Sequence, residues 1–463
     1  MAKKKEKTLE EKLQEALVPE NQWPYILPEN WCWVKFGSLA KDMADGPFGS
    51  NLKTEHYINE KEVRIIQLSN VSENGWKDDN VRYTTFEHAK TISRSIVKPG
   101  DIVITKMMPA GRAMICPNLE KEYVLSSDSV KFVPWDCLDR KYMTLGINST
   151  VFRKQVQENT QGITRARTSL KKLKSYIYPL APLAEQKRIV YRIESLFAKL
   201  DEAKEKIQQV LDGAEMRKAA ILHKAFTGEL TKNWRKENTA IFENSSLGID
   251  EELISDNLKE LPDKWCWCKI GDFLELKAGK NIKADNISIE KNNNNKYACY
   301  GGNGIRGYVD SFNVEGTHII IGRQGALCGN INIAENKFYA TEHAVVVYPR
   351  YDTDISWLSE NLRFLNLNQY SRSAAQPGLA VKNINNVLMP VAPYAEQIEM
   401  GRLISQMLNV WKQKEIICNK VLNKIDTMKK SILAKAFRGE LGTNNPNEDS
   451  AINLLKEVLQ DKL

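Results

Sequence analysis

The sequence predicts an α+β fold arranged as a pseudo-two-fold repeat, in which two α/β domains are held apart by two long antiparallel coiled-coil helices. Three observations lead to this prediction. A heptad seam runs from Ala184 to Phe226, a second seam runs from Met400 to Ile432, and the same short motifs flank both seams. The first segment would form a helix roughly 64 Å long, because an α-helix rises about 1.5 Å per residue.

The two seams are built from apolar residues at alternating spacings of four and three positions, which is typical of helices that pack along one another. No proline interrupts the first seam, whose one glycine is Gly213, and only Lys414 breaks the second. The residues predicted to pack are Ile189, Ile193, Leu196, Leu200, Ile207 and Val210 in the first seam, and Ile404, Met407, Trp411, Val421 and Ile425 in the second. The alternative is an ordinary buried helix in each of two duplicated domains, although globular helices average only about 11–12 residues.

The flanking motifs indicate that the frame of the chain is duplicated. A Trp motif precedes each globular segment, a Pro-x-Ala-Glu-Gln motif precedes each seam, and a Gly-Glu-Leu motif follows it. The pairs are Leu27-Pro-Glu-Asn-Trp-Cys-Trp33 with Leu261-Pro-Asp-Lys-Trp-Cys-Trp267, Pro179-Leu-Ala-Pro-Leu-Ala-Glu-Gln186 with Pro390-Val-Ala-Pro-Tyr-Ala-Glu-Gln397, and Ala225-Phe-Thr-Gly-Glu-Leu230 with Ala436-Phe-Arg-Gly-Glu-Leu441. The segments between the motifs do not match, so a repeated scaffold carries two middles that are free to differ.

These features predict the order of domains along the chain. An N-terminal arm at 1–24 precedes a first globular domain at 25–180, a long helix at 181–230 and a polar linker at 231–259. A second globular domain at 260–391 precedes a long helix at 392–441 and a C-terminal tail helix at 442–463. Short β-branched runs bounded by Gly, Pro or Asp predict that both globular domains are rich in strands.

The composition is that of an ordinary soluble protein, with 42% hydrophobic and 27% charged residues. The sequence contains no run of 18 apolar residues, so it predicts no membrane span. The lysine-rich N-terminus lacks the apolar stretch of a secretory signal. The eight cysteines form no Cys-x-x-Cys pair, so we expect free thiols in a reducing cytoplasm and no zinc site. The net charge of +8 is compatible with a polyanionic partner but does not identify one.

The motif search predicts no catalytic centre, no metal site and no cofactor in this chain. Gly302-Asn-Gly-Ile-Arg-Gly307 has the spacing of a dinucleotide-binding loop, but a strand-like segment follows it instead of a helix, which favours a glycine-rich hairpin. Asp263, Glu275 and Lys277 resemble the carboxylate and lysine set of a metal-dependent nuclease. The first copy of the repeat lacks that set, so we interpret it as a chance match.

Polar, Gly-containing loops with basic residues remain, three in each globular domain. Glycine lets a backbone approach a ligand closely, while Arg, Lys, Asn, Gln, Ser and Thr can bind base edges or phosphates. Any single loop could be a solvated turn, but six such loops favour nucleic acid. The candidate DNA-binding residues are Ser50, Asn51, Lys53, Lys106, Arg112, Thr164, Arg165 and Arg167 in the first domain, and Lys280, Arg306, Arg323, Gln324, Arg372 and Gln376 in the second.

With these motifs together, the chain resembles the specificity subunits of type I restriction–modification systems over essentially its whole length. Besides the repeated frame, the resemblance rests on Asp45-Gly-Pro-Phe-Gly-Ser50, Gly322-Arg-Gln-Gly-Ala-Leu-Cys-Gly329 and Phe338-Tyr-Ala-Thr341. It implies two target recognition domains, each reading one half of a bipartite site in double-stranded DNA, in the cytoplasm of a prokaryote. It also implies that the helices act as a spacer and dock two modification subunits, and that restriction subunits join the complex. S-adenosylmethionine, ATP and Mg²⁺ would then reside on those partners.

Three hypotheses follow from the sequence. The first is a non-catalytic DNA specificity subunit whose helix length sets the gap between half-sites, with half-site centres roughly 34 Å apart. The second is a stand-alone bipartite sequence-specific DNA-binding protein, which would bind tightly without partners. The third is a nuclease that uses Asp263, Glu275 and Lys277.

Overall fold

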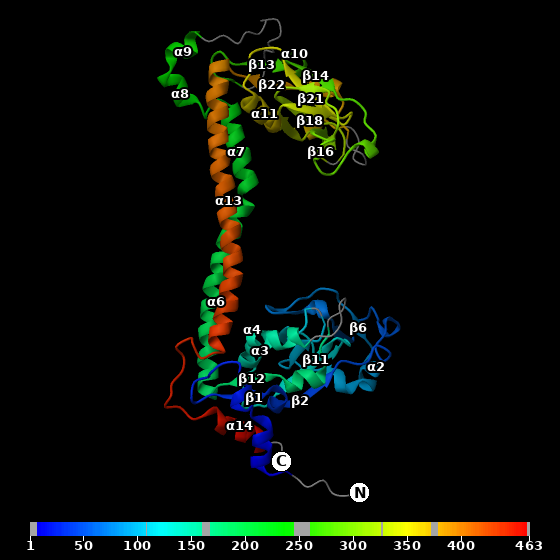
Figure 1. Ribbon diagram of the computed structural model, residues 1–463, viewed down its shortest axis with the longest axis vertical. Helices are drawn as coiled ribbons and strands as arrows, with labels where there is room; N and C mark the ends of the chain where they lie inside the picture. Colours follow the sequence, from blue (N-terminus) through cyan, green and yellow to red (C-terminus); the bar gives the residue numbers. More distant parts are fainter. Residues whose placement is uncertain are drawn as a thin grey trace. The chain divides into compact units, whose positions relative to one another are not determined.

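The computed structural model describes residues 7–107, 109–159, 167–244, 260–325, 327–371 and 378–460. The chain divides into two compact units (Figure 1). Unit 1 comprises Met1–Lys206 and Lys420–Leu463, and unit 2 comprises Ile207–Asn419. Each unit therefore contains one globular domain and a part of both long helices. Among the described residues, no helix is both long and apolar enough to cross a membrane.

The globular domain of unit 1 contains two four-stranded sheets. The first has the strand order β2-β11-β8-β9 and is antiparallel throughout, and the second has the order β6-β3-β10-β7 with a parallel β3–β10 pair. The strands of the first sheet are β2 (Ala40–Asp45), β8 (Ile102–Thr105), β9 (Ala113–Ile115) and β11 (Ser129–Pro134). Those of the second are β3 (Val63–Ile66), β6 (Tyr83–Thr84), β7 (Ile96–Val97) and β10 (Tyr123–Leu125), and β4 (Val71–Ser72) pairs with β5 (Gly75–Trp76).

The globular domain of unit 2 repeats this arrangement. Its first sheet has the order β14-β21-β18-β19, and its second has the order β16-β15-β20-β17 with a parallel β15–β20 pair. The strands are β14 (Leu274–Ala278), β18 (His318–Gly322), β19 (Ile331–Ala334) and β21 (Ala344–Pro349), then β15 (Tyr297–Gly301), β16 (Gly304–Val309), β17 (Val314–Glu315) and β20 (Lys337–Ala340). The middles whose sequences do not match thus share their sheet topology. The glycine-rich segment 302–307 lies in the β15–β16 hairpin, as predicted.

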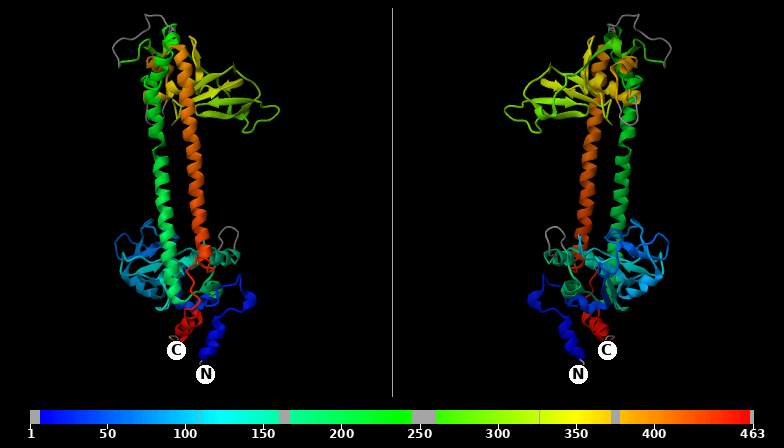
Figure 2. Two further views of the ribbon diagram at one scale, coloured as in Figure 1. Left: turned by 90° about the vertical axis from the view of Figure 1, so that its left-hand side faces the viewer. Right: turned by 90° about the vertical axis from the view of Figure 1, so that its right-hand side faces the viewer.

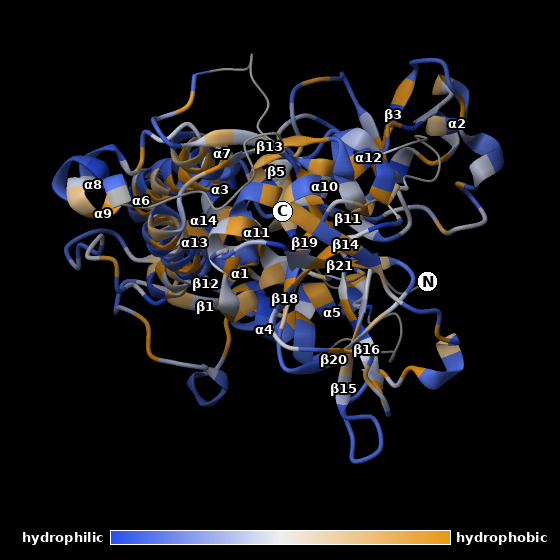
Figure 3. Ribbon diagram, turned by 90° about the horizontal axis from the view of Figure 1, so that it is seen from above, coloured by the Kyte–Doolittle hydropathy of each residue, from blue (hydrophilic) through white to orange (hydrophobic). Residues whose placement is uncertain are grey.

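Short helices cover and connect these sheets. In unit 1 they are α1 (Leu9–Ala16), α2 (Phe86–Thr91), α3 (Arg140–Asn148), α4 (Thr150–Glu158), α5 (Leu170–Ser175) and α14 (Ala451–Gln460), and in unit 2 α8 (Lys232–Glu237), α9 (Thr239–Asn244), α10 (Ile270–Phe273), α11 (Ile355–Phe364) and α12 (Val381–Asn385). The 3₁₀ turns are Glu20–Gln22, Phe36–Leu39, Thr54–His56, Leu68–Asn70, Ser93–Ser95, Ala284–Asn286 and Leu367–Tyr370. Apolar residues are concentrated on the strands and inner helix turns, whereas the connecting loops are mostly hydrophilic (Figure 3).

Two of the predicted segments contain short helices. The segment predicted as an N-terminal arm contains α1, which packs against α14, and the leucines of α1 join the core of unit 1. The segment predicted as a polar linker begins with α8 and α9, and residues 245–259 lie outside the described part. Polar composition alone predicted a linker there, because neither short helix buries a wide apolar face.

The long helices are α6 (Leu183–Asp212), α7 (Ala214–Phe226) and α13 (Tyr394–Ala436). The continuous first helix expected from the seam is interrupted at Gly213, where backbone hydrogen bonds continue on both sides but glycine weakens the helix. Within unit 1, Asp201 pairs with Lys429 at 2.5 Å and Lys204 with Asp426 at 3.6 Å, so α6 and α13 run antiparallel and side by side (Figure 2).

The seam residues differ in how deeply they are buried. Ile189, Ile193, Ile404 and Ile425 are buried, while Leu196, Leu200, Ile207 and Trp411 are half-buried. Val210, Met407 and Val421 are more than a third exposed, although the heptad pattern predicts that they pack. Two helices alone cover only a narrow strip of each other, so residues at the edge of the seam stay in contact with water.

The repeated motifs join the ends of each globular domain to the start of its long helix. The Trp motif forms β1 (Cys32–Lys35), which pairs with β12 (Ile177–Leu180) directly before α6. In unit 2, β13 (Cys266–Lys269) pairs with β22 (Leu388–Val391) directly before α13. The same pairing in both units explains why these motifs recur in the sequence.

A buried glutamate closes each of these junctions. In unit 1 the carboxylate of Glu185 accepts hydrogen bonds from Trp31 Nε1 at 2.7 Å, Asn444 Nδ2 at 2.8 Å and Thr443 Oγ1 at 3.3 Å. The neighbouring side chain of Gln186 accepts the backbone N–H of Asp139 and donates to the carbonyl of Ala181.

The glutamate of unit 2 is Glu396. Its carboxylate accepts from Trp265 Nε1 at 2.8 Å and Thr231 Oγ1 at 2.5 Å, and it pairs with Arg235. Gln397 bonds the backbone of Asp354 as Gln186 bonds that of Asp139. Burying a carboxylate is costly unless donors surround it, so the Trp of one motif and the Glu of the other are required together.

Candidate DNA interface

The same backbone hydrogen bonds frame one edge of the first sheet in each domain. In unit 1, Gly46 N donates to Ser129 O at 2.9 Å, Lys106 N to Asp128 O at 2.7 Å, and Thr168 N to Lys106 O at 2.9 Å. These bonds bring together the end of β2, the start of the loop after β8 and residues 167–169 before α5, which lie in the described parts of three predicted loops.

Unit 2 has the corresponding set. Gly279 N donates to Ala344 O at 2.9 Å, Arg323 N to His343 O at 2.9 Å, and Leu379 N to Arg323 O at 2.8 Å. Position by position, Gly46 therefore corresponds to Gly279 and Lys106 to Arg323, while Asp128 corresponds to His343. The frame is shared, and the side chains that it presents differ.

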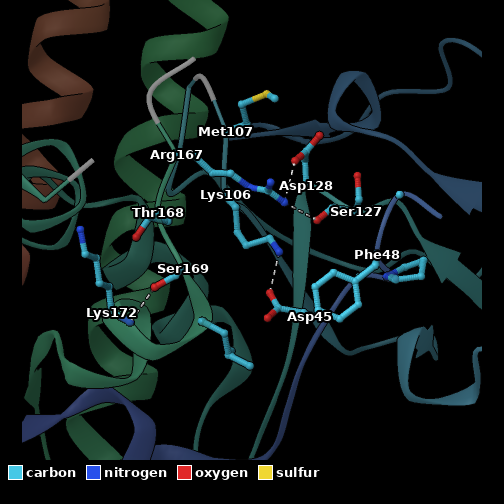
Figure 4. Close-up of a pocket in the computed structure, with 14 residues that line it drawn as sticks. Asp45, Phe48, Lys106, Met107, Ser127, Asp128, Arg167, Thr168, Ser169 and Lys172 are labelled. Carbon is cyan, nitrogen blue, oxygen red and sulfur yellow. Dashed lines mark hydrogen bonds and ion pairs between the residues drawn. The ribbon is translucent and has the colours of Figure 1, made fainter. Parts of the chain in front are cut away.

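In unit 1 this frame surrounds a pocket of about 580 Å³. Figure 4 shows two cations pointing at carboxylates across it. Lys106 Nζ lies 2.6 Å from Asp45 Oδ1, and Arg167 lies 3.1 Å from Asp128 Oδ1 and donates to the carbonyl of Ser127 at 3.2 Å. The remaining lining residues include Phe48, Met107, Thr168, Ser169 and Lys172.

The two ion pairs leave different amounts of each cation available. The Lys106 side chain is only 7% exposed, so Asp45 holds its ammonium group at the pocket wall. The Arg167 side chain is 49% exposed, and its guanidinium has donors beyond those used by Asp128 and Ser127. Arg167 can thus present donors to a base edge or a phosphate without leaving its pair.

In unit 2 a pocket of about 530 Å³ lies at the corresponding edge. It is lined by the β15–β16 hairpin with Arg306, by Gln324 and Gly325, and by His343. His343 Nε2 lies 3.2 Å from Glu342 Oε1, while Glu342 Oε2 and His343 Nδ1 have no hydrogen-bond partner within the described residues. This pocket therefore offers an amide, a guanidinium and an imidazole, and Glu342 lies next to that imidazole outside the lining.

The structure brings some of the predicted DNA-binding residues together and not others. Lys106 and Arg167 line the unit 1 pocket, and Arg306 and Gln324 line the unit 2 pocket. Six of the predicted residues are described but line neither pocket: Ser50, Asn51, Lys53, Arg112, Lys280 and Arg323. Thr164, Arg165, Arg372 and Gln376 lie outside the described residues.

Several pocket residues were absent from the predicted set. Asp45 and Phe48 belong to a loop that the sequence singled out, but a search for donors passes over a carboxylate and a phenyl ring. Asp128 and His343 sit directly before a strand, and only the folded sheet shows that they face the loops. The polar residues that open β11 and β21 were the signal that could have identified them.

The residues of the nuclease hypothesis do not form a set. Glu275 and Lys277 lie on β14, where Lys277 Nζ contacts Glu275 Oε2 at 3.0 Å and lies over the ring of Tyr348. Asp263 lies in the segment before β13, and β13 belongs to a different sheet from β14. The pair on β14 is an ordinary surface ion pair.

Comparison with known proteins gives consistent matches. The profile of the type I restriction modification DNA specificity domain matches residues 43–212 and 262–423. The chain is 38% identical to the type I restriction enzyme EcoprrI specificity subunit of Escherichia coli over 37% of this chain and 41% of that protein, so this alignment spans less than half of the relative. It is 21% identical to the EcoKI specificity subunit of Escherichia coli strain K12 over 94% of this chain and 96% of that protein.

Solved structures share the fold. One matching chain comes from work on the structural basis of complex assembly and conformational transition of the type I R-M system. Its TM-score is 0.67 at 18% identity, and the match covers 90% of this chain and 100% of that one. The HsdS subunit from Thermoanaerobacter tengcongensis has a TM-score of 0.58 at 18% identity, covering 90% and 99%. At this level of identity the likeness concerns the fold.

Proposed function

Because this chain belongs to the family of type I restriction–modification DNA specificity proteins, we propose that its two units each read one half of a bipartite site in double-stranded DNA. The chain is a specificity subunit, and catalytic activity belongs to the assembled complex. The repeated frame with different side chains is the observation that carries the proposal. One frame can dock on DNA in the same way twice while the two pockets select different bases.

The chemistry of the two pockets suits base reading. In unit 1 the Nε and Nη1 groups of Arg167, which its contacts with Asp128 and Ser127 do not use, can donate hydrogen bonds to guanine O6 or N7. In unit 2 the side chain of Gln324 can pair with adenine N6 and N7, and Arg306 can bind guanine or phosphate. The different donor sets would give half-sites of different sequence.

The proposal extends to partners and cofactors. Two modification subunits would dock on the helices and supply adenine methylation from S-adenosylmethionine, and restriction subunits would supply ATP- and Mg²⁺-dependent translocation and cleavage. The exposed seam residues Val210, Met407 and Val421 are apolar surface that such partners could cover. The complex would act in the cytoplasm, where a prokaryotic chromosome is accessible.

Methylome sequencing tests the proposal directly. The chain is co-expressed with the modification subunits of its own system in a host that lacks them. A new bipartite adenine-methylation motif that requires this chain is expected. Tight specific binding by the chain alone would instead favour a stand-alone DNA-binding protein, and the absence of any bipartite motif would contradict the proposal.

Single substitutions then assign each half-site. Arg167→Ala should relax one half-site and Arg306→Ala the other, at a cost of about 1–3 kcal/mol in binding if the arginine reads a base. An arginine that only touches phosphate would leave the motif intact and lower the salt dependence of binding. Lys121→Ala is the matched control, because Lys121 is exposed in unit 1 but lines neither pocket. Relaxation of the same half-site by both arginine substitutions would contradict the assignment.

A further inference from the structure

Phe48 is a large apolar side chain that the fold of unit 1 leaves in water. It is 82% exposed and lies at the rim of the unit 1 pocket, between Gly46 and Gly49 (Figure 4). Single exposed apolar residues are common on proteins, so exposure alone says little. The support of its loop and the groups that share its pocket distinguish this phenylalanine from other exposed apolar residues.

The loop that carries Phe48 is anchored on both sides. On one side, Ser95 Oγ donates to the carbonyl of Asp45 at 3.1 Å, and Gly46 packs so closely that a Cβ there would lie 1.9 Å from the carbonyl oxygen of Ser126. On the other side, Asn51 N donates to the carbonyl of Phe48 at 2.8 Å, and Leu52 is buried. The ring is therefore held out on a short, fixed loop.

Cations line the same pocket as the ring. They are Lys106, Arg167 and Lys172, with Asp45 and Asp128 as the carboxylates that orient the first two, and Arg167 is the one whose side chain is half exposed. An exposed apolar ring in a pocket with a half-exposed guanidinium matches a partner that offers flat apolar faces beside negative charges. Nucleic acid has this combination, since bases stack on aromatic side chains while phosphates pair with Lys and Arg.

We propose that Phe48 is a stacking wedge that inserts at a base step of the half-site read by unit 1. The inference rests on the proposed function and deepens it, because it assigns to one residue the contact with a base face. Insertion would partly unstack the step and bring Arg167 closer to the neighbouring base edges. Selectivity would then arise from the ease of unstacking as well as from hydrogen bonds.

At the corresponding position of the described part of unit 2 the side chain is polar. Since Gly46 corresponds to Gly279 in the shared frame, Phe48 corresponds to Asn281. Asn281 is also exposed, and its carbonyl accepts a hydrogen bond from Tyr339 Oη at 3.2 Å. The aromatic ring at this position is thus particular to unit 1, and Asn281 supplies the natural replacement for a test: Phe48→Asn gives unit 1 the side chain that unit 2 has.

The test uses the assembled methyltransferase and duplexes containing its methylated motif. 2-Aminopurine is placed at each position of the unit 1 half-site in turn, because its fluorescence rises when stacking is lost. Apart from the adenine that the methyltransferase itself flips out of the stack, we expect a rise at one step with the wild-type complex and none there with Phe48→Asn or Phe48→Ala. Affinity for the duplex should fall roughly 5- to 140-fold, the range measured for aromatic–base stacking. Phe86→Ala is the control, since Phe86 is an exposed phenylalanine of unit 1 that does not line the pocket.

The possible outcomes separate this inference from the function on which it depends. A wild-type complex that methylates a bipartite motif, with unchanged fluorescence and affinity in the Phe48 variants, overturns the wedge alone. Loss of modification subunits from Phe48→Ala in native mass spectrometry assigns the ring to a protein interface and also overturns it. Failure of the wild-type complex to recognise any bipartite motif contradicts the proposed function itself.

Discussion

The buried glutamates at the two helix starts allow a matched test of how each unit is held together. Glu396 in unit 2 is fully buried and faces Arg235, whose side chain is itself mostly buried. Glu396→Gln keeps the shape but removes the charge, so the guanidinium loses its counter-ion. Breaking a buried ion pair by removing one partner costs about 3–5 kcal/mol. We therefore expect Glu396→Gln to destabilise unit 2 by that amount.

Glu185 in unit 1 provides the comparison. Its three donors, from Trp31, Thr443 and Asn444, are neutral, and the nearby Arg188 is already paired with Glu448 through two bonds of 2.7 and 2.8 Å. Glu185→Gln replaces hydrogen bonds to a charged acceptor by weaker hydrogen bonds to a neutral one. This loss is partly offset because burying an amide costs less than burying a carboxylate. The expected loss is about 1–2 kcal/mol.

Amide hydrogen exchange measures the two losses separately. A chain with two compact units need not unfold in one step, so a single melting temperature would mix them. Protection of the backbone amides of residues 265–268 and 396–404 against exchange reports the stability of unit 2. Protection of the amides of residues 31–34 and 185–193 reports the stability of unit 1. The reasoning is refuted if Glu185→Gln costs as much as Glu396→Gln, or if either substitution changes protection mainly in the other unit.

Two further predictions follow from the packing. Gly46→Ala should destabilise unit 1 by more than about 1 kcal/mol in urea unfolding, because the new Cβ would lie 1.9 Å from the carbonyl oxygen of Ser126. Gly49→Ala is the control and should be near neutral, since no atom lies within 4 Å of a Cβ at that position. Equal losses of stability in the two variants would contradict the close approach at Gly46. Seven residues inserted after Ala203 together with seven after Asp426 keep the antiparallel pairing in register. The methylated motif should then gain about three base pairs in its gap, since seven helical residues span roughly 10 Å, and an unchanged gap would refute the spacer role.

The repeat and the long helices could be predicted from the sequence because both depend on local pattern. A heptad period and a motif that recurs with its Trp, Glu and Gln can be recognised without knowledge of the fold. The interruption at Gly213 was not predicted, since a helix can continue through one glycine at a modest cost. The exposure of Val210 was missed because a heptad pattern shows which face packs, not how much of it the partner helix covers.

The shared architecture of the two middles could not be predicted. Their strands are short, their loops differ in length, and strand pairing between distant segments leaves little trace in one sequence. For the same reason the pockets were only partly identified. Arg167 was recognised as a donor, but the pairing that orients it depends on Asp128, which is brought to the loop by the sheet.

The composition of unit 1 from residues 1–206 and 420–463 has a consequence for synthesis on the ribosome. Unit 2 is continuous in sequence and can fold as soon as it emerges. Unit 1 must wait for a segment made after unit 2, a delay of roughly 13–50 s at the usual rate of translation. During that time Glu185 lacks two of its donors and the incomplete unit exposes apolar surface. A nascent chain of this kind is a natural substrate for chaperones.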